Sequence, residues 1–330
     1  MDTEPSYLHK QAAHCESGVV SSLLRHRGLD LSEAMVFGLS SALMFSYIPI
    51  IKINGMPLIS YRNIPRGIIK GIQSRLGIKF KTITYNNPLL AHNELLSFMD
   101  RCCIVGLQTS VYWLPYFPPE MRFQFNAHNL IVYGRSNGDL LISDPVFDHV
   151  VRIKPEDLQN ARFAKGMLAP KGYLYYPLEI PAALDLDKAI RRAIKKTVFM
   201  MLPSPPPFGV RGIHYLANSI GKLGQNADKR YVKLLLGHIV RMQEEIGTGG
   251  GGFRYLYAAF LQEASQILSL RELEEASLKM TEAGDLWRAF ALSAVGYIKN
   301  KGIALPEIAN SIRQCAYAEK NVFSFLKSVV

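Results

Sequence analysis

The sequence predicts an α+β domain followed by an all-helical domain, and three observations indicate this. The chain has 330 residues, 48% of them apolar, which is enough for two domains of ordinary size with hydrophobic cores of their own. Helix-like periodicity near the N-terminus gives way to a series of short strand-like runs, and after Pro181 the pattern becomes that of amphipathic helices. We therefore expect an α+β domain over residues 1–180 and a helical domain over residues 181–330.

Two helices are expected before the strands. The first carries Cys15 at its N-terminal edge and is stopped by Gly28, and the second runs from Leu31 to Ser46 with Ser32 as its cap. The apolar run from Ala34 to Ile51 is long enough to cross a membrane, but its serines, glycine and proline favour a buried helix.

Strand-like runs follow, bounded by turn residues. They lie at Ile51 to Tyr61, Lys79 to Tyr85, Cys102 to Leu114, His128 to Tyr133, Leu140 to Ser143, Val150 to Ile153 and Gly172 to Tyr176. A helix pair followed by an antiparallel sheet is typical of an α+β domain.

The second half contains amphipathic periodic stretches. They start near Asp187, Ile213, Asp228, Phe253, Arg271, Asp285 and Pro306. The run Pro203-Ser-Pro-Pro-Pro207 interrupts the first of them.

Cysteine usage and charge exclude several classes of protein. The four cysteines include an adjacent pair and show no metal-binding spacing, which argues against a disulfide framework and against a zinc site. With no export signal visible at the start, a reducing cytoplasm fits best. The net charge of +11 is spread evenly over both halves, so we expect no nucleic-acid partner, whereas an acidic protein or an anionic substrate is compatible with it.

Cys15, His128 and Asp144 are the candidate catalytic residues. They supply a thiol, a base and an orienting carboxylate, the set that performs acyl transfer through a thioester. A thiol at a helix N-terminus beside an imidazolium is activated as a nucleophile. The alternatives are a structural cysteine and a histidine whose hydrogen bonds only stabilise the fold.

The register of one hairpin decides whether His128 and Asp144 meet. A two-residue Asn137-Gly138 loop would set residue 144 opposite 131 and leave the two side chains on opposite faces. A three-residue loop starting at Ser136 sets 144 opposite 130, so that both side chains share a face as diagonal neighbours. We predict the three-residue loop.

Donors for an oxyanion are also needed. The backbone N–H of Cys15 and the side-chain amide of Gln11 are candidates, although Gln11 fits a solvated polar position equally well. The aromatic stretch from Tyr112 to Phe117 either lines an acyl pocket or packs as core and loop.

Two motifs of the second half could bind anionic partners. Positive side chains recur on one helix face at Lys188, Arg191, Arg192, Lys195 and Lys196. This face is either simply solvated or docks an acidic carrier protein, with a membrane surface ranked behind. The glycine run after Gly247 is either a flexible connector or an anion site, and the candidate anion-binding residues are Thr248, Gly249, Gly250 and Arg254.

These residues resemble a known family. The order Cys, His, Asp with an upstream Gln resembles papain-like cysteine peptidases, especially the bacterial kind that cleaves leader peptides at double-glycine sites. The segments from His14 to Gly18, Gly28 to Gly38 and Phe45 to Tyr47, with Ser143-Asp144-Pro145, resemble the butirosin biosynthesis protein H family more closely. The second half is similar to the helical domain usually attached to it, around Phe208-Gly209 and Gly247 to Arg254. Gln11 lies closer to Cys15 than the peptidase pattern has it.

The resemblance implies a papain-like acyltransferase of secondary-metabolite or lipid biosynthesis. It would take an acyl group from the phosphopantetheine arm of an acyl carrier protein and pass it to an amine or hydroxyl of a small molecule, without a tightly bound cofactor. Carried over by position, Cys15 would attack, His128 would act as base and Asp144 would orient His128. A hydrolase or peptidase with the same triad, and a non-catalytic module that binds a carrier or peptide, are the alternatives.

Overall fold

A computed structural model describes residues 7–53, 55–101, 103–223 and 227–330 of the chain. The described residues within Met1–Val36 and Ile68–Ala183 form one compact unit, and those within Phe37–Gly67 and Leu184–Val330 form another. The boundary after Ala183 is close to the division predicted near residue 180. Residues 37–67 differ from the expectation, because they belong to the same unit as the C-terminal helices.

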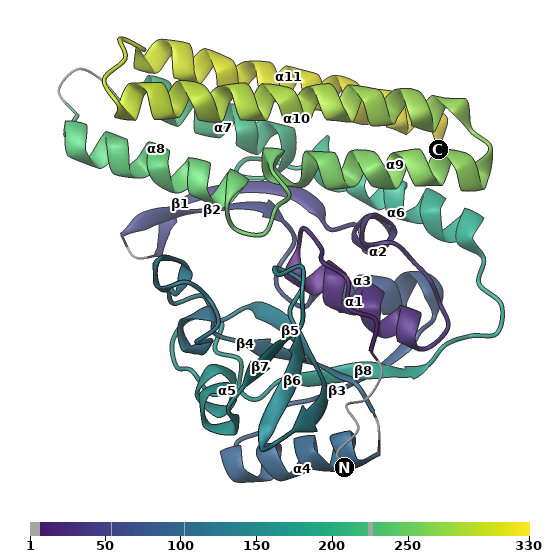
Figure 1. Cartoon of the computed structure of the whole chain (residues 1–330). Helices are drawn as coiled ribbons and strands as arrows, with labels where there is room; N and C mark the ends of the chain where they lie inside the picture. Colours follow the sequence, from purple (N-terminus) through teal and green to yellow (C-terminus); the bar gives the residue numbers. More distant parts are fainter. Residues whose placement is uncertain (1–6, 54, 102, 224–226) are drawn as a thin grey trace. The chain divides into compact units, whose positions relative to one another are not determined.

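The first unit is built on a six-stranded antiparallel sheet with strand order β3-β8-β4-β5-β6-β7 (Figure 1). Its strands are β3 (Lys79–Ile83), β4 (Val105–Thr109), β5 (His128–Ser136), β6 (Asp139–Ser143), β7 (Val151–Ile153) and β8 (Leu174–Glu179). Each falls on a predicted strand-like run, and the α+β class is confirmed. Cys102, the expected start of the run that contains β4, lies outside the described residues.

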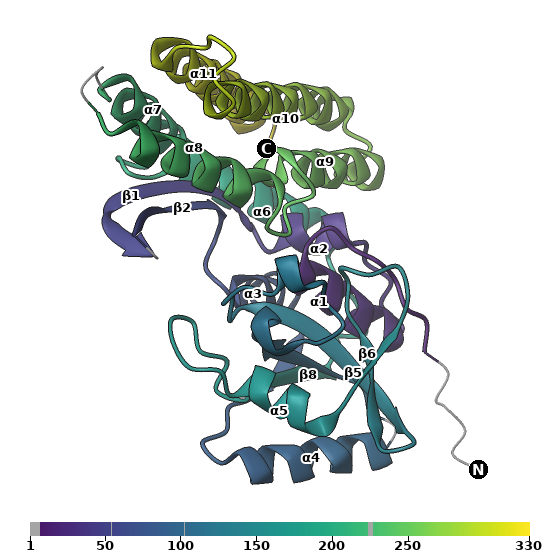
Figure 2. The same cartoon turned by 60° about the vertical axis from the view of Figure 1, so that its left-hand side comes forward.

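Helices cover this sheet on both sides. Of the helices α1 (Cys15–His26), the start of α2 (Glu33–Leu39), α3 (Gly67–Leu76), α4 (Pro88–Asp100) and α5 (Pro155–Arg162), the first and the last two pack against the sheet. The unit also contains two short 3-10 turns, η1 (Val111–Trp113) and η2 (Pro119–Met121). Figure 2 shows α1 on one side of the sheet and α4 and α5 on the other. The sequence reading missed α3, α4 and α5.

The helix that carries Cys15 is confirmed. His14 is its N-cap and accepts the N–H of Ser17 through the ring, while Gly28 follows the helix with a φ of 85°, a conformation that favours glycine. Every residue from Cys15 to Leu24 is buried, so α1 is a core helix of the first unit. Its N-terminus therefore has a fixed position against the sheet.

The second predicted helix is only partly correct. Ser32 caps α2 as expected, its hydroxyl accepting the N–H of Met35, but the helix ends at Leu39 rather than Ser46. Ser41 adopts a left-handed conformation, and strand β1 (Leu43–Ile53) follows and pairs with β2 (Met56–Arg62). An aromatic and β-branched run suits a strand better than a helix, and tertiary pairing outweighed the apolar periodicity that indicated a continuous helix.

None of the helices among the described residues is both long enough and apolar enough to cross a membrane.

The second unit combines a β-hairpin with helices. It contains β1 (Leu43–Ile53), β2 (Met56–Arg62), α6 (Leu186–Met201), α7 (Gly209–Gly221), α8 (Lys229–Glu244), η3 (Gly251–Phe253), α9 (Arg254–Leu268), α10 (Arg271–Ile298) and α11 (Leu305–Val329). Figure 1 shows α10 and α11 side by side above α7 and α9. The predicted helix start at Asp285 was wrong, because α10 continues through it.

A buried ion pair lies in the core of the second unit. The guanidinium of Arg254 donates from Nε and Nη2 to the two carboxylate oxygens of Glu319 at 2.9 and 3.0 Å, and both side chains are fully buried. The indole N–H of Trp287 donates to the same carboxylate, and the guanidinium lies over the rings of Tyr61 and Trp287. This pair joins α9, α10, α11 and the hairpin.

The Glu319→Gln variant should lose about 3–5 kcal/mol of unfolding free energy, because it leaves the buried guanidinium without a counter-charge. Urea denaturation followed by circular dichroism measures the loss. Asp187→Asn is the control, since Asp187 pairs with Arg191 on the surface of α6 and should change stability by less than about 1 kcal/mol. Equal effects of the two variants would contradict the role given to the buried pair.

Candidate active site

The turn before α1 holds Cys15 in place through a carboxylate. Glu33 accepts the backbone N–H of Ala13 at 2.8 Å, the N–H of His14 at 2.7 Å and the hydroxyl of Ser17 at 3.0 Å. Burial raises the pKa of Glu33, and the donated hydrogen bonds oppose that rise. The two residues before the thiol are thereby fixed at the N-terminus of the helix.

His128 and Asp144 form a buried pair in the first unit. The ring Nε2 of His128 lies 2.7 Å from a carboxylate oxygen of Asp144, and both side chains are almost completely removed from solvent. His128 is the first residue of β5, so its ring lies at the end of the sheet. The structure therefore brings together the two residues that were predicted to form a base and its orienting carboxylate.

The register that allows this contact arises differently from the prediction. Ser136 pairs with Asp139, so the loop is the two-residue Asn137-Gly138 turn, with φ of 51° and 85°. The three-residue loop was wrong. A bulge between Val132 and Gly134 then shifts the pairing by one residue, so that Ile131 opposes Ser143. The predicted alignment of residues 130 and 144 follows from the bulge instead of the turn.

Cys15 reaches the same place from the helix. Cys15 is 8% exposed, and its sulfur lies 4.0 Å from the carbonyl of Ala127, the residue directly before His128. Burial lowers the pKa of His128, but the charge and hydrogen bond of Asp144, with a smaller contribution from Cys15, outweigh burial and raise it to about 10. The imidazolium form is thus stabilised beside the sulfur.

Aromatic residues surround the pair. The hydroxyl of Tyr116 donates to Asp144 at 2.9 Å, and Phe117 sets its ring edge-to-face against His128 with centroids 5.5 Å apart. Burial and the neighbouring Asp144 raise the pKa of Tyr116, so it remains a hydroxyl donor. The second half of the predicted aromatic stretch, Tyr116 and Phe117, therefore packs around the His128–Asp144 pair.

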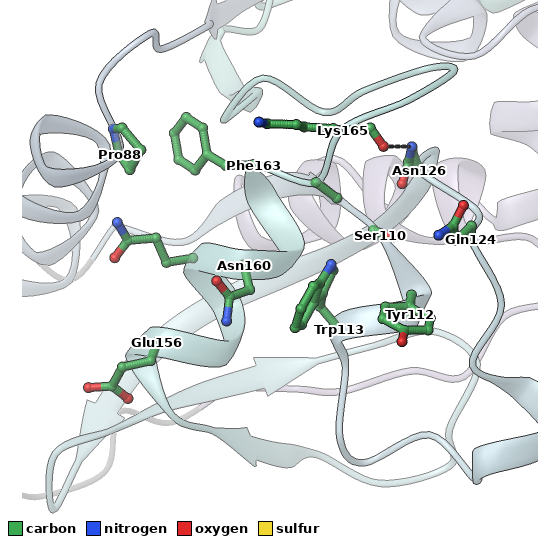
Figure 3. A pocket seen from close by; sticks show the side chains of 12 residues that line it. Pro88, Ser110, Tyr112, Trp113, Gln124, Asn126, Glu156, Asn160, Phe163 and Lys165 are labelled. Atoms are coloured by element: carbon green, nitrogen blue, oxygen red, sulfur yellow. Dashed lines mark hydrogen bonds between the residues drawn. The ribbon is translucent and has the colours of Figure 1, made fainter.

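The other half of that stretch lines a cavity of about 550 Å³ in the first unit. Figure 3 shows Trp113 next to Asn160 of α5, with Tyr112 beyond Trp113 and Lys165 in the loop that follows α5. The cavity also includes Asn126, which directly precedes Ala127, the residue whose carbonyl lies 4.0 Å from the sulfur of Cys15. It therefore adjoins the start of β5.

Gln11 was a candidate oxyanion donor beside Cys15, but its amide is directed elsewhere. Its side chain is exposed, and its amide donates to the carbonyl of Val146 at 3.1 Å. The neighbouring N–H of Ala12 donates to Pro145, and His9 bonds to Ser143. Gln11 thus belongs to a set of bonds that tie the N-terminal segment to the loop around Asp144, and sequence spacing could not show this.

The cationic helix face lies on the surface as predicted. On α6, Lys188, Arg192, Lys195 and Lys196 are exposed, whereas Arg191 is half-buried and paired with Asp187. The opposite side of the helix is buried. The face is free for solvent or a partner.

The predicted anion site does not form in this conformation. Arg254 is fully buried against Glu319, and the hydroxyl of Thr248 donates to Gln243 and accepts the N–H of Gly250. Gly249 and Gly250 adopt left-handed conformations in a tight connector. The arginine was misassigned because its charge is neutralised by a glutamate 65 residues away in the sequence.

Within the described part of the chain, no group of three or more His, Cys, Asp or Glu side chains is arranged to hold a metal ion.

Comparisons with known proteins agree with the sequence resemblance. The family model for butirosin biosynthesis protein H, N-terminal, matches residues 14–145, and the model for a domain of unknown function, DUF4872, matches residues 156–326. The first match identifies residues 14–145 as a domain of the butirosin biosynthesis protein H, N-terminal, type, and these residues include Cys15, His128 and Asp144. The second covers more than half of the chain, and this chain belongs to the DUF4872 family.

Among solved structures, a Bacillus anthracis protein described as a C39-like peptidase is similar to 54% of this chain and 96% of its own, with 13% identity and a TM-score of 0.37. The comparison with curated proteins gave no match.

Replacing Asp144 by Asn should lower the pKa of His128 from about 10 to below 6.5, because burial then acts without the opposing carboxylate. In the wild type, the stability gained from the raised pKa is fully present below about pH 6.5 and is lost as the pH rises through about 10. NMR titration of the imidazole carbons measures the pKa directly. Asp148→Asn is the control, because Asp148 pairs with His149 on the surface and should leave His128 unchanged. A His128 pKa that stays near 10 in Asp144→Asn would contradict the assignment.

Proposed function

We propose that this chain is a cysteine acyltransferase that accepts an acyl group from an acyl carrier protein thioester and transfers it to an amine or hydroxyl of a small molecule. The observation that carries the proposal is the buried His128–Asp144 pair beside the thiol of Cys15. The butirosin biosynthesis protein H match over residues 14–145 supports a biosynthetic reaction of this kind.

The proposed reaction has two half-reactions. The thiolate of Cys15 attacks the thioester carbonyl, the carrier thiol leaves with a proton from His128, and the acyl group rests on Cys15. The acceptor amine or hydroxyl then attacks this new thioester while His128 takes its proton, and the Cys15 thiolate leaves. Asp144 keeps the ring oriented and stabilises the imidazolium throughout.

Features of each unit fit the two substrates. The exposed positive face of α6 is complementary to an acidic carrier protein that presents its phosphopantetheine arm. The cavity beside β5, with Tyr112 and Trp113 in its wall, is the proposed acyl pocket. No resident cofactor enters the scheme.

Incubation with an acyl carrier thioester should add one acyl mass to the protein, and Cys15→Ala should abolish the adduct because the nucleophile is gone. His128→Ala should slow its formation by about 10²–10⁴-fold. Intact-mass spectrometry measures both. Cys103→Ala, which removes an exposed cysteine, is the matched control and should form the adduct normally.

The outcomes separate the competing functions. Transfer of the adduct to added amines supports the acyltransferase, whereas release to water alone with every amine tried would replace it by a hydrolase. A wild-type protein that binds the carrier but never gains the acyl mass would reduce the chain to a binding module.

Reversing the charge of Lys188, Arg192, Lys195 and Lys196 to Glu should raise KM for the carrier-bound substrate by about tenfold or more, because like charges now face the acidic carrier. Steady-state kinetics with the carrier thioester and with a short soluble thioester measure the effect. The short thioester has no carrier to dock, so the variant should have the same KM for it as the wild type. An equal rise in KM for both substrates would contradict carrier docking on α6.

A further inference from the structure

We propose that Asn129 is a third polar partner of Cys15, whose side-chain amide donates a hydrogen bond to the sulfur and stabilises its thiolate form. The inference rests on the proposed role of Cys15 as the nucleophile.

The geometry brings a buried amide to the sulfur. The Nδ2 of Asn129 lies 3.9 Å from the Sγ of Cys15, a distance typical of a weak N–H to sulfur hydrogen bond, and Asn129 is 5% exposed. Asn129 follows His128 on β5, so the two side chains start from opposite faces of the sheet.

The neighbours of Asn129 fix which end of its amide faces the thiol. Its Nδ2 lies 3.0 Å from the carbonyl of Ala127, and a carbonyl can only accept, so this end must be the NH₂ group. One of the two hydrogens is used there, and the other is left for the sulfur. The carbonyl of Ala127 also lies 4.0 Å from Sγ and can accept from the neutral thiol.

A tyrosine holds the opposite end of the amide. The hydroxyl of Tyr175 on β8 donates to the Oδ1 of Asn129 at 2.9 Å, and Tyr175 is fully buried. Burial, with the nearby charge of Glu16, raises the pKa of Tyr175, so the hydroxyl keeps its proton and continues to donate. Tyr175 is therefore a positioning residue, and Asn129 is the group that contacts the reacting atom.

This arrangement distinguishes the two forms of the sulfur. A neutral thiol needs an acceptor and finds the carbonyl of Ala127, whereas a thiolate needs donors and finds Asn129 together with the imidazolium of His128. Hydrogen bonds to a charged group are stronger than those between neutral groups, so the amide favours the thiolate.

The test is the pH dependence of iodoacetamide alkylation at Cys15, read by peptide mass spectrometry so that the other cysteines do not contribute. Asn129→Leu and the isosteric Asn129→Asp should both raise the midpoint of the alkylation profile by about one pH unit, and alkylation below the midpoint should fall about tenfold, as expected for loss of one hydrogen bond to a charged group. Tyr175→Phe should shift the midpoint in the same direction by a smaller amount, because the amide keeps its bond to Ala127.

Gln108→Leu is the matched control. Gln108 lies opposite Asn129 on β4, is equally buried, and donates its amide to the carbonyls of Asn126 and Leu168 instead of to the sulfur. If the loss of any buried amide raised the alkylation midpoint, Gln108→Leu would raise it too. If Asn129 acts through its bond to the sulfur, the midpoint of Gln108→Leu stays at the wild-type value. Thermal melting identifies any variant that does not fold.

The results distinguish failure of the role given to Asn129 from failure of the proposed function. Midpoints of folded Asn129→Asp and Tyr175→Phe that equal the wild type overturn the role of Asn129 while leaving Cys15 reactive. A wild-type Cys15 that is alkylated at neutral pH no faster than the exposed Cys103 overturns the proposed nucleophile itself.

Discussion

A carboxylate withdrawn from water must receive hydrogen bonds from the protein, and the candidate site depends on how Asp144 meets this requirement. Asp144 is fully buried and receives three donors: the ring of His128, the hydroxyl of Tyr116 and the backbone N–H of Val146. These donors come from a strand, an aromatic loop and the turn after β6. Because losing any one of them would leave a buried charge poorly compensated, the charge of Asp144 fixes the conformation of all three segments.

The same principle applies on the helix side of the thiol. Glu33 binds the backbone just before α1, and the bonds from His9, Gln11 and Ala12 tie the preceding segment to the loop around Asp144. Two carboxylates that are distant in the sequence thus hold the two ends of one site. Asp144 is fully buried and Glu33 is partly buried, and donors of the chain itself bind both carboxylates, so the site has a fixed geometry before any substrate arrives.

The sequence was sufficient for the class of fold and for naming His128 and Asp144, which the structure pairs, because strand alternation and turn residues are local signals. It was insufficient where distant residues decide. The bulge after Val132 cannot be seen in the hairpin sequence, Arg254 gave no sign of Glu319, and the run after Leu39 became a strand because β2 pairs with it. Asn129 was overlooked because only the folded sheet brings it beside Cys15. Tyr116 lay in a stretch that was recognised as aromatic, but its bond to Asp144 required the three-dimensional arrangement.

The hairpin of β1 and β2 has an implication for how such chains are inherited. Phe45 and Tyr61, from the hairpin, pack against Trp287 of α10, so the helical unit is incomplete without a segment encoded far upstream of it. A single recombination event near residue 180 would separate the hairpin from its helices and expose aromatic surface on both products. Genes of this architecture should therefore exchange both units as one block, and fragments divided at the apparent border should aggregate when expressed alone.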